Sequence, residues 1–355
     1  MRTKTGPSSP YLLLMITMVL WGSAFSSSKS VVEQVPHTVA ALLRFGGGAV
    51  ALLAALWLFG SRKATGTARG GWRAAVTGRG GRRAAMTARG GWRAAMTARG
   101  GWRAAMAGVL GVFAYNGFFF WGLSLAPSLD AGILIPVMSP VLTSAFLLVT
   151  RREHASWART AGLGLGLAGA VVFFLGAGGS SHGGSTRLAG DALFLLAALC
   201  WAAYTLAGPR VLAGMEPLRA TTYTTCAGAV LLSVIAAPDL PEVRWSELSA
   251  GVWLNLAYLA LGAAAVANLL YYRGIGAVGP ARASLMMFTV PVINTLCATV
   301  FLGESFGALQ GAGALVLLAG AVLAVTQGRL PKRPARSAGT RRTREAREPE
   351  GHAGR

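Results

Sequence analysis

Ten apolar runs, each about long enough to cross a lipid bilayer, constrain this chain more than any other feature. A transmembrane helix needs about 20 mostly apolar residues, and lipid tolerates only helices or closed barrels because their backbone polar groups are satisfied internally. The sequence therefore predicts an all-α polytopic membrane protein with ten transmembrane helices. The runs cover roughly residues 11–31, 37–60, 104–125, 131–150, 159–177, 188–208, 218–237, 250–272, 283–302 and 307–327.

Charge is scarce along the chain and is confined to a few segments. The 33 Lys and Arg residues outnumber 12 Asp and Glu and give a net charge of +21, yet charged residues make up only 13% of the sequence. Most of the excess lies in residues 62–103 and 329–355. Nucleic-acid-binding proteins are usually rich in charge throughout, so we expect no nucleic-acid partner for the core.

The basic residues also predict an orientation. With the N-terminus inside and ten alternating spans, 29 of the 33 basic residues lie on the cytoplasmic side and three outside. Because basic residues beside membrane spans stay cytoplasmic, both termini are predicted inside a multi-pass plasma-membrane protein.

The chain repeats itself, with five apolar runs in each half. Asn116 precedes Asn268 by 152 residues, whereas Trp21 precedes Trp201 by 180. The first half therefore carries about 28 extra residues, which coincide with the arginine-rich segment 62–103. Five spans per half invert the second half relative to the first, and inverted repeats are typical of secondary transporters with a site at the repeat interface.

These patterns predict five regions. They are a cytoplasmic N-terminus (1–10), a first repeat (11–177) with the insertion 62–103, an extracytoplasmic linker (178–187), a second repeat (188–327) and a basic, disordered cytoplasmic tail (328–355).

Several short strings resemble the EamA family of the drug/metabolite transporter superfamily. They are Leu20–Phe25, Arg44-Phe45, Ser139-Pro140 and Gly303-Glu304, in order along two five-span halves. The first half departs from the family in reading Arg152-Glu153 where Gly-Glu is usual. The resemblance implies ten helices and secondary transport, here predicted as export, of small metabolites or drugs such as amino acids. It implies no enzymatic activity.

Arg44 is the only basic residue well inside a predicted span. A charge in hydrocarbon is costly, so this side chain should face a partner or a substrate, for example a carboxylate. The alternative is that Arg44 snorkels to the outer interface, roughly 10 Å away at 1.5 Å per residue.

Amide and aromatic side chains inside the spans are further candidates for binding a substrate. The amides either bind a polar group or form hydrogen bonds between helices, and the aromatic rings either line the same site or pack. The complete set of predicted substrate-binding residues is Trp21, Arg44, Tyr115, Asn116, Trp201, Tyr204, Tyr223, Asn268 and Asn294.

Proline interrupts two predicted spans, at Pro136 and Pro140 and at Pro291. Each proline removes a backbone donor, so these positions are either hinges or static kinks.

Acidic residues at span ends are candidates for carrying protons. Glu153, Glu304 and Asp191 lie near such ends, where a solvated or capping role is the favoured interpretation.

The run Gly164–Gly169 matches the dinucleotide-binding fingerprint in letters only, because it lies in an apolar span without a preceding strand. With Gly162 it predicts a small-residue face for close helix packing instead. The four histidines are scattered, and the sequence predicts no metal and no cofactor.

The insertion 62–103 repeats every ten residues, with paired glycines that we expect to break any continuous helix. Its Trp and Arg residues, with those of 329–355, suit contact with anionic lipid headgroups. Two alternatives for the insertion are that it binds RNA or that it is a linker without any role. The linker is the favoured interpretation. The second functional hypothesis is accordingly a membrane-anchored interaction protein. The sequence also leaves open whether the protein forms a homodimer.

Overall fold

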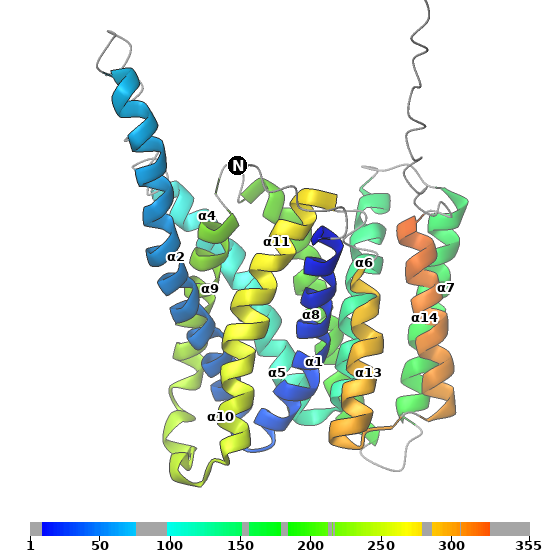
Figure 1. Ribbon diagram of the computed structural model, residues 1–355. Helices are drawn as coiled ribbons and strands as arrows, with labels where there is room; N and C mark the ends of the chain where they lie inside the picture. The colour runs from blue at the N-terminus through cyan, green and yellow to red at the C-terminus, as the bar shows by residue number, and fades with distance from the viewer. Residues whose placement is uncertain are drawn as a thin grey trace, which may run out of the picture.

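The computed structural model describes residues 9–75, 98–150, 156–178, 184–211, 215, 217–278, 286–305 and 307–326. Within these ranges the chain is a bundle of helices and contains no strand (Figure 1). Residues 76–97 of the insertion, residues 179–183 of the linker and the whole tail 328–355 lie outside the described residues.

The helices of each half follow the predicted order. The first half comprises α1 (Ser9–Val32), α2 (His37–Ala75), α4 (Ala98–Gly108), the π-helical η1 (Val109–Ala114), α5 (Tyr115–Leu125), α6 (Ser128–Val149) and α7 (Trp157–Gly178). The second half comprises α8 (Gly184–Val211), α9 (Pro217–Ala236), the 3-10 turns η2 (Leu240–Glu242) and η3 (Trp245–Glu247), α10 (Ala250–Ala257), the π-helical η4 (Tyr258–Val266), α11 (Ala267–Val278), α13 (Thr289–Leu302) and α14 (Ala308–Thr326).

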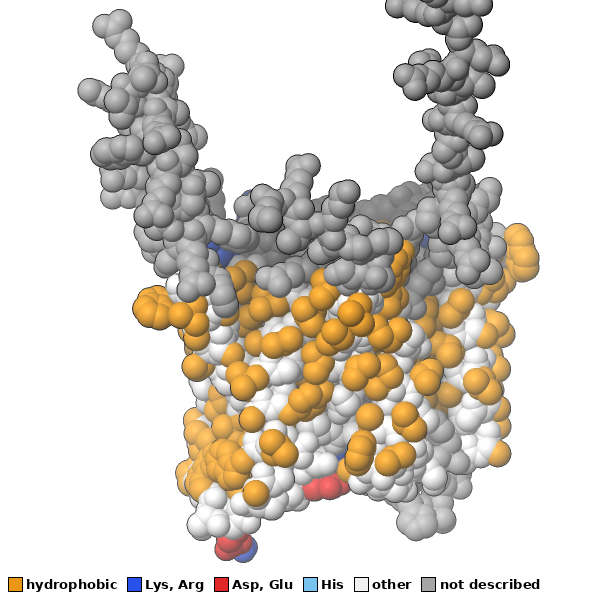
Figure 2. Space-filling view, in the orientation of Figure 1, with side chains coloured by type: hydrophobic (Ala, Val, Ile, Leu, Met, Phe, Trp, Pro, Cys, Tyr) orange, Lys and Arg blue, Asp and Glu red, His pale blue; other side chains and the backbone are white. Residues whose placement is uncertain are grey.

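The prediction of an all-α polytopic membrane protein is confirmed. Eight helices of the described chain are long and apolar enough to cross a membrane, and two shorter apolar helices cover Thr289–Leu302 and Ala308–Ala324. Apolar side chains spread over the lateral face of the bundle, whereas the acidic side chains in view lie at its lower rim and the basic ones at its lower and upper edges (Figure 2). An exterior of this kind is stable against lipid tails, because burial in hydrocarbon replaces burial in a protein core. The total of ten spans remains a prediction.

The shortest connection in the first half separates α5 from α6 at Ala126 and Pro127. Both residues are extended, with ψ angles of 163° and 152°. A residue before proline is disfavoured in the helical region, so the helix ends here, and Pro127 then precedes the first turn of α6.

The expected break at the paired glycines of the insertion is wrong at both of its described edges. The helix α2 continues through Gly70-Gly71, and α4 includes Gly100-Gly101. A glycine costs a helix only about 1 kcal/mol relative to alanine, which the neighbouring alanine and arginine residues partly offset.

Helix packing is nearly unchanged when the two halves are exchanged. The helix α1 packs against α11 and α13, and its counterpart α8 packs against α5 and α6. In the same way α2 packs against η4, and α9 packs against η1. The contacts α2–α9, α6–α13 and α7–α14 each join a helix to its own counterpart, and α7 and α14 lie side by side (Figure 1).

Glycines bring the backbones of α7 and α14 into direct contact. A Cβ atom at Gly169 would lie 2.2 Å from the Leu317 nitrogen, and one at Gly313 would lie 2.4 Å from the Phe173 nitrogen. By contrast, a Cβ at Gly164 would meet nothing within 4 Å. The predicted small-residue packing face is therefore confirmed, because only glycine permits this approach.

Replacement of Gly169 by leucine is expected to lower the free energy of unfolding by about 1–3 kcal/mol, because a larger side chain forces α7 away from α14. Thermal unfolding of the purified protein in detergent measures the loss. Gly164→Leu is the matched control and should unfold like the wild type. Equal losses in the two variants would contradict the interface.

Candidate functional site

Aromatic side chains from both halves meet where α1 approaches α8. The rings of Trp21 and Trp201, which are repeat counterparts, lie edge-on with centroids 6.4 Å apart. Tyr271 lies 4.7 Å from Trp21, while Tyr115 and Tyr204 lie 5.3 and 5.7 Å from Trp201. We call these five residues the aromatic cluster, and it is built equally around the tryptophan of each half.

The predicted set of aromatic residues and the aromatic cluster of the structure differ at Tyr223 and Tyr271. Tyr223 is half-buried on α9, and no ring contact joins it to the cluster within the described chain. Tyr271 was not among the predicted residues. The 152-residue offset pairs it with Phe119, whose ring stacks on Tyr115 at 6.1 Å, so the repeat itself carried the signal.

Arg44 is buried in the bundle, with 9% of its surface exposed. It donates a hydrogen bond to the Ser28 hydroxyl at 3.2 Å, and its guanidinium carbon lies 5.1, 5.7 and 5.9 Å from the rings of Phe45, Phe119 and Phe120. Its Nε has no hydrogen-bond partner, and in the described part of the chain no acidic side chain pairs with it. Arg44 therefore does not extend to the outer interface, and no described carboxylate neutralises its positive charge.

Phe119 connects Arg44 to the aromatic cluster. The Arg44 guanidinium carbon lies 5.7 Å from the centroid of the Phe119 ring, and the same ring stacks on that of Tyr115. We call Arg44, Phe119 and the aromatic cluster together the central site. A guanidinium, a group suited to binding a carboxylate, and aromatic rings, which suit contact with an apolar group, are thus contiguous.

The paired amides Asn116 and Asn268 serve matching π-helical segments. Each donates a hydrogen bond of 2.7 Å to the carbonyl four residues earlier, that of Val112 in η1 and that of Ala264 in η4. Neither bond joins two helices, so the interpretation that these two amides form hydrogen bonds between helices is wrong for the bonds they donate. Widened turns of this kind are frequent at functional sites. The buried Asn116 Oδ1 has no hydrogen-bond partner.

Asn294 lies apart from the aromatic cluster and joins two helices. Its Nδ2 donates to the Ser128 carbonyl at 3.1 Å, so it links α13 to the start of α6. A side chain at Gly132 would collide with this amide, because an added Cβ would lie 2.0 Å from Nδ2. Asn294 therefore has a packing contact between the halves in this structure.

The two predicted interruptions by proline differ in outcome, because within the span 283–302 a turn at Phe288 separates residues 286–287 from α13. The helix α6 is continuous through Pro136 and Pro140. Pro291 lies in the first turn of α13, where a backbone amide has no acceptor within the helix. A hinge at these positions stays a prediction.

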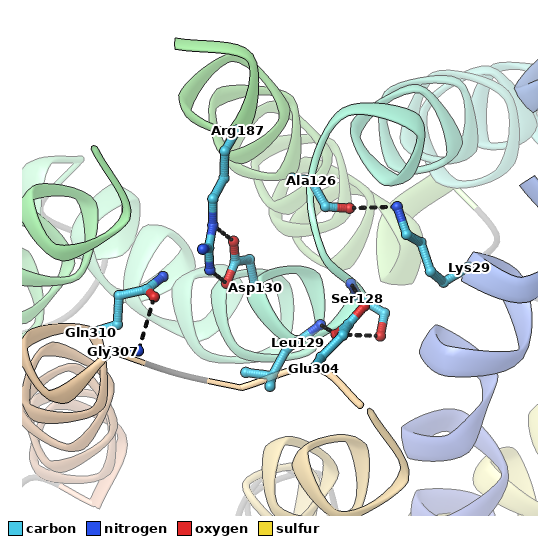
Figure 3. Close-up of polar contacts among 9 residues, drawn as sticks. All are labelled: Lys29, Ala126, Ser128, Leu129, Asp130, Arg187, Glu304, Gly307 and Gln310. Carbon is cyan, nitrogen blue, oxygen red and sulfur yellow. Dashed lines mark hydrogen bonds and ion pairs between the residues drawn. The ribbon is translucent and has the colours of Figure 1, made fainter. Parts of the chain in front are cut away.

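Glu304 caps the first turn of α6 at one end of the bundle (Figure 3). Its carboxylate accepts hydrogen bonds from the Ser128 amide and hydroxyl, each at 2.9 Å, and from the Leu129 amide at 2.8 Å. Lys29 donates to the Leu123 and Ala126 carbonyls nearby. The capping interpretation of Glu304 is confirmed, and the negative charge suits the helix N-terminus.

Asp130 and Arg187 form a buried ion pair beside this cap (Figure 3). The Arg187 Nε and Nη2 donate to the two Asp130 oxygens at 2.7 and 2.8 Å, joining α6 of one half to α8 of the other. Asp191, one turn along α8, is 0% exposed, so its predicted solvation is wrong. Sequence reasoning missed the ion pair because nothing local relates two residues in different halves.

A helical membrane bundle of two exchangeable halves, with buried binding groups between them, has the architecture of a secondary transporter. The model of the EamA-like transporter family matches residues 8–175 and 188–326, and the chain belongs to this family. It is therefore a multi-pass membrane transporter of the drug/metabolite type, which handles small molecules.

Named relatives agree with this class. The chain is 27% identical over 225 residues to the uncharacterized transporter YyaM of Bacillus subtilis (strain 168), covering 63% of this chain and 73% of that protein. It is 29% identical over 229 residues to the aromatic amino acid exporter YddG of Ancylobacter novellus, covering 62% and 75%. It is 28% identical over 222 residues to the probable terminal-alkyne amino-acid exporter of Streptantibioticus cattleyicolor, covering 61% and 70%.

A crystal structure shares the fold. The similarity has a TM-score of 0.57 at 23% sequence identity and covers 91% of this chain and 98% of the other.

Arg44 and Arg187, which are both buried, should respond differently to replacement. Arg187→Leu leaves the Asp130 carboxylate buried without its partner and is expected to cost about 3–5 kcal/mol of stability. Arg44→Leu removes an uncompensated charge and should be neutral within about 1 kcal/mol or stabilising. Thermal unfolding in detergent compares them. A larger loss for Arg44→Leu would mean that Arg44 is a structural residue.

Proposed function

We propose that the protein exports amino acids or closely related carboxylates with an apolar or aromatic side chain, bound at the central site. The single observation that carries this proposal is Arg44, a buried cation without an acidic partner that is contiguous with the aromatic cluster. Two of its relatives are named an aromatic amino acid exporter and a probable terminal-alkyne amino-acid exporter, which supports the same substrate class.

A substrate carboxylate would supply the negative charge that Arg44 lacks among its described neighbours. Isolated charge in a low-dielectric interior is costly, and a carboxylate bound to guanidinium gains strong charge-assisted hydrogen bonds. The Arg44 Nε is an unused donor for such a bond. The rings of Trp21, Tyr115 and Trp201 would then contact the apolar part of the substrate.

Transport by alternating access fits the way the halves meet. The rings of Trp21 and Trp201 touch across the repeat interface, and the ion pair between Asp130 and Arg187 crosses it near the α6 N-terminus. Rocking of one half against the other would separate these contacts and expose the central site to one side at a time.

Loss of the Arg44 charge should affect substrates according to their carboxylate. In proteoliposomes, Arg44→Leu is expected to reduce phenylalanine transport about 10–100-fold, the equivalent of a charge-assisted hydrogen bond of 1.5–3 kcal/mol. Phenethylamine, which lacks the carboxylate, should be transported no worse than by the wild type.

Two results would count against the proposal. Equal losses for both compounds would reduce Arg44 to a structural residue. Failure of the wild type to move any amino acid in a broad panel would remove the substrate class.

We also propose that the protein lies in the plasma membrane with both termini on the cytoplasmic side, because most basic residues flank the spans on that side. A reporter that is active only in the cytoplasm, fused after Arg355, should be active, and one fused at Ser246 should be silent. The reverse pattern would contradict this orientation.

A further inference from the structure

Asp191 is the least compensated ionisable group in the described part of the bundle outside the central site. The residue is 0% exposed, and neither carboxylate oxygen has a hydrogen-bond partner. An ionised carboxylate with no donor in such surroundings is severely penalised, because burial removes its hydration. The substrate proposed above does not explain this group, since Asp191 lies in the second turn of α8 and away from Trp201.

The nearest charged neighbours make an ionised Asp191 still less favourable. Its carboxyl interacts with that of Asp130 on α6. Both Asp130 oxygens already accept from Arg187, one turn earlier on α8. One arginine therefore faces two buried carboxylates.

Among the residues that the structure describes, the other groups around the pair offer no second cation. Glu304, which interacts with Arg187, uses its oxygens to cap α6, and Lys29 donates to backbone carbonyls. The helix α5 that packs on α8 contributes only Tyr115 as a titratable group, and η1 contributes none. Arg159 on α7 and Arg103 on α4 begin their spans at the opposite end of the bundle.

Two ionised carboxylates are both acceptors and cannot form a hydrogen bond with each other. A single proton between them supplies the missing donor, removes one negative charge and leaves the second charge paired with Arg187. We propose that Asp130 and Asp191 form a proton-binding pair that holds one proton while α6 and α8 are in contact.

Coupling of this site to transport rests on the function proposed above. When the halves separate at the α6 N-terminus, the O–H bond breaks and the proton passes to the water that enters. The pair then carries two negative charges against one arginine, which disfavours renewed contact until a proton returns. The coupling ion would thus be a proton.

Infrared titration of the full-length protein tests proton binding without any substrate. At a pH where exposed carboxyls are ionised, the wild type should show a protonated-carboxyl C=O band that shifts in D₂O and disappears on alkalinisation. Asp191→Asn should lose this band. Glu247→Gln, which changes an exposed carboxylate paired with Arg244, is the control and should retain it.

A second variant keeps the test decisive if Asp191→Asn does not fold. In Asp130→Asn the remaining carboxylate gains Arg187 for itself, so the band should again be lost. Absence of the band in the wild type, its persistence in either aspartate variant, or its removal by added Na⁺ at constant pH would overturn the proton-binding pair.

Proteoliposomes test the coupling separately, with phenylalanine as the probe. A pH gradient should accelerate phenylalanine movement by the wild type, and Asp191→Asn should lose that dependence on the gradient. Equal acceleration of both proteins would overturn the coupling. If the wild type moves no phenylalanine, the proposed function fails while the infrared result still decides the proton site.

Discussion

The absence of water in the bilayer is the constraint on which the rest of this structure depends. Serine and threonine side chains in the spans bond to carbonyls of their own helices, as Thr143 does to Ser139 and Thr224 to Ala220. Against that background, a buried polar atom without a partner requires a reason. The Arg44 Nε, the Asn116 Oδ1 and the Asp191 oxygens are such atoms, and two of the three carry the proposals made for substrate and proton.

The repeat determines backbone geometry more strictly than it determines chemistry. The segments η1 and η4 widen at equivalent positions, and Asn116 and Asn268 satisfy equivalent carbonyls. The counterpart of Arg44 at the 180-residue offset is Thr224, which bonds to its own helix. Two similar halves therefore surround one asymmetric central site, in which the Arg44 cation comes from the first half. Such asymmetry would suit the proposed substrate, which has one charged end and one apolar end.

Beside the helix packing of α1, α2, α8 and α9 between the halves, two further contacts that join them differ in kind. Along α7 and α14 the backbones touch through glycines, so this interface resists separation over its whole length. Near the α6 N-terminus the halves are joined by a few polar groups, among them Asp130 with Arg187 and Glu304 with Ser128. Breaking those bonds costs little once water can replace them.

The sequence by itself determined the helical spans, the two-half organisation and most of the aromatic residues of the central site, because length, hydropathy and repeat spacing are properties of the linear chain. It also found the glycine face of α7, since small residues recur at helical intervals. Only the tertiary structure decided that Arg44 is enclosed, that Tyr271 joins the cluster and that Asp191 lies beside Asp130. Burial and pairing depend on which helices become neighbours, and residues in different halves leave no local pattern from which that choice can be inferred.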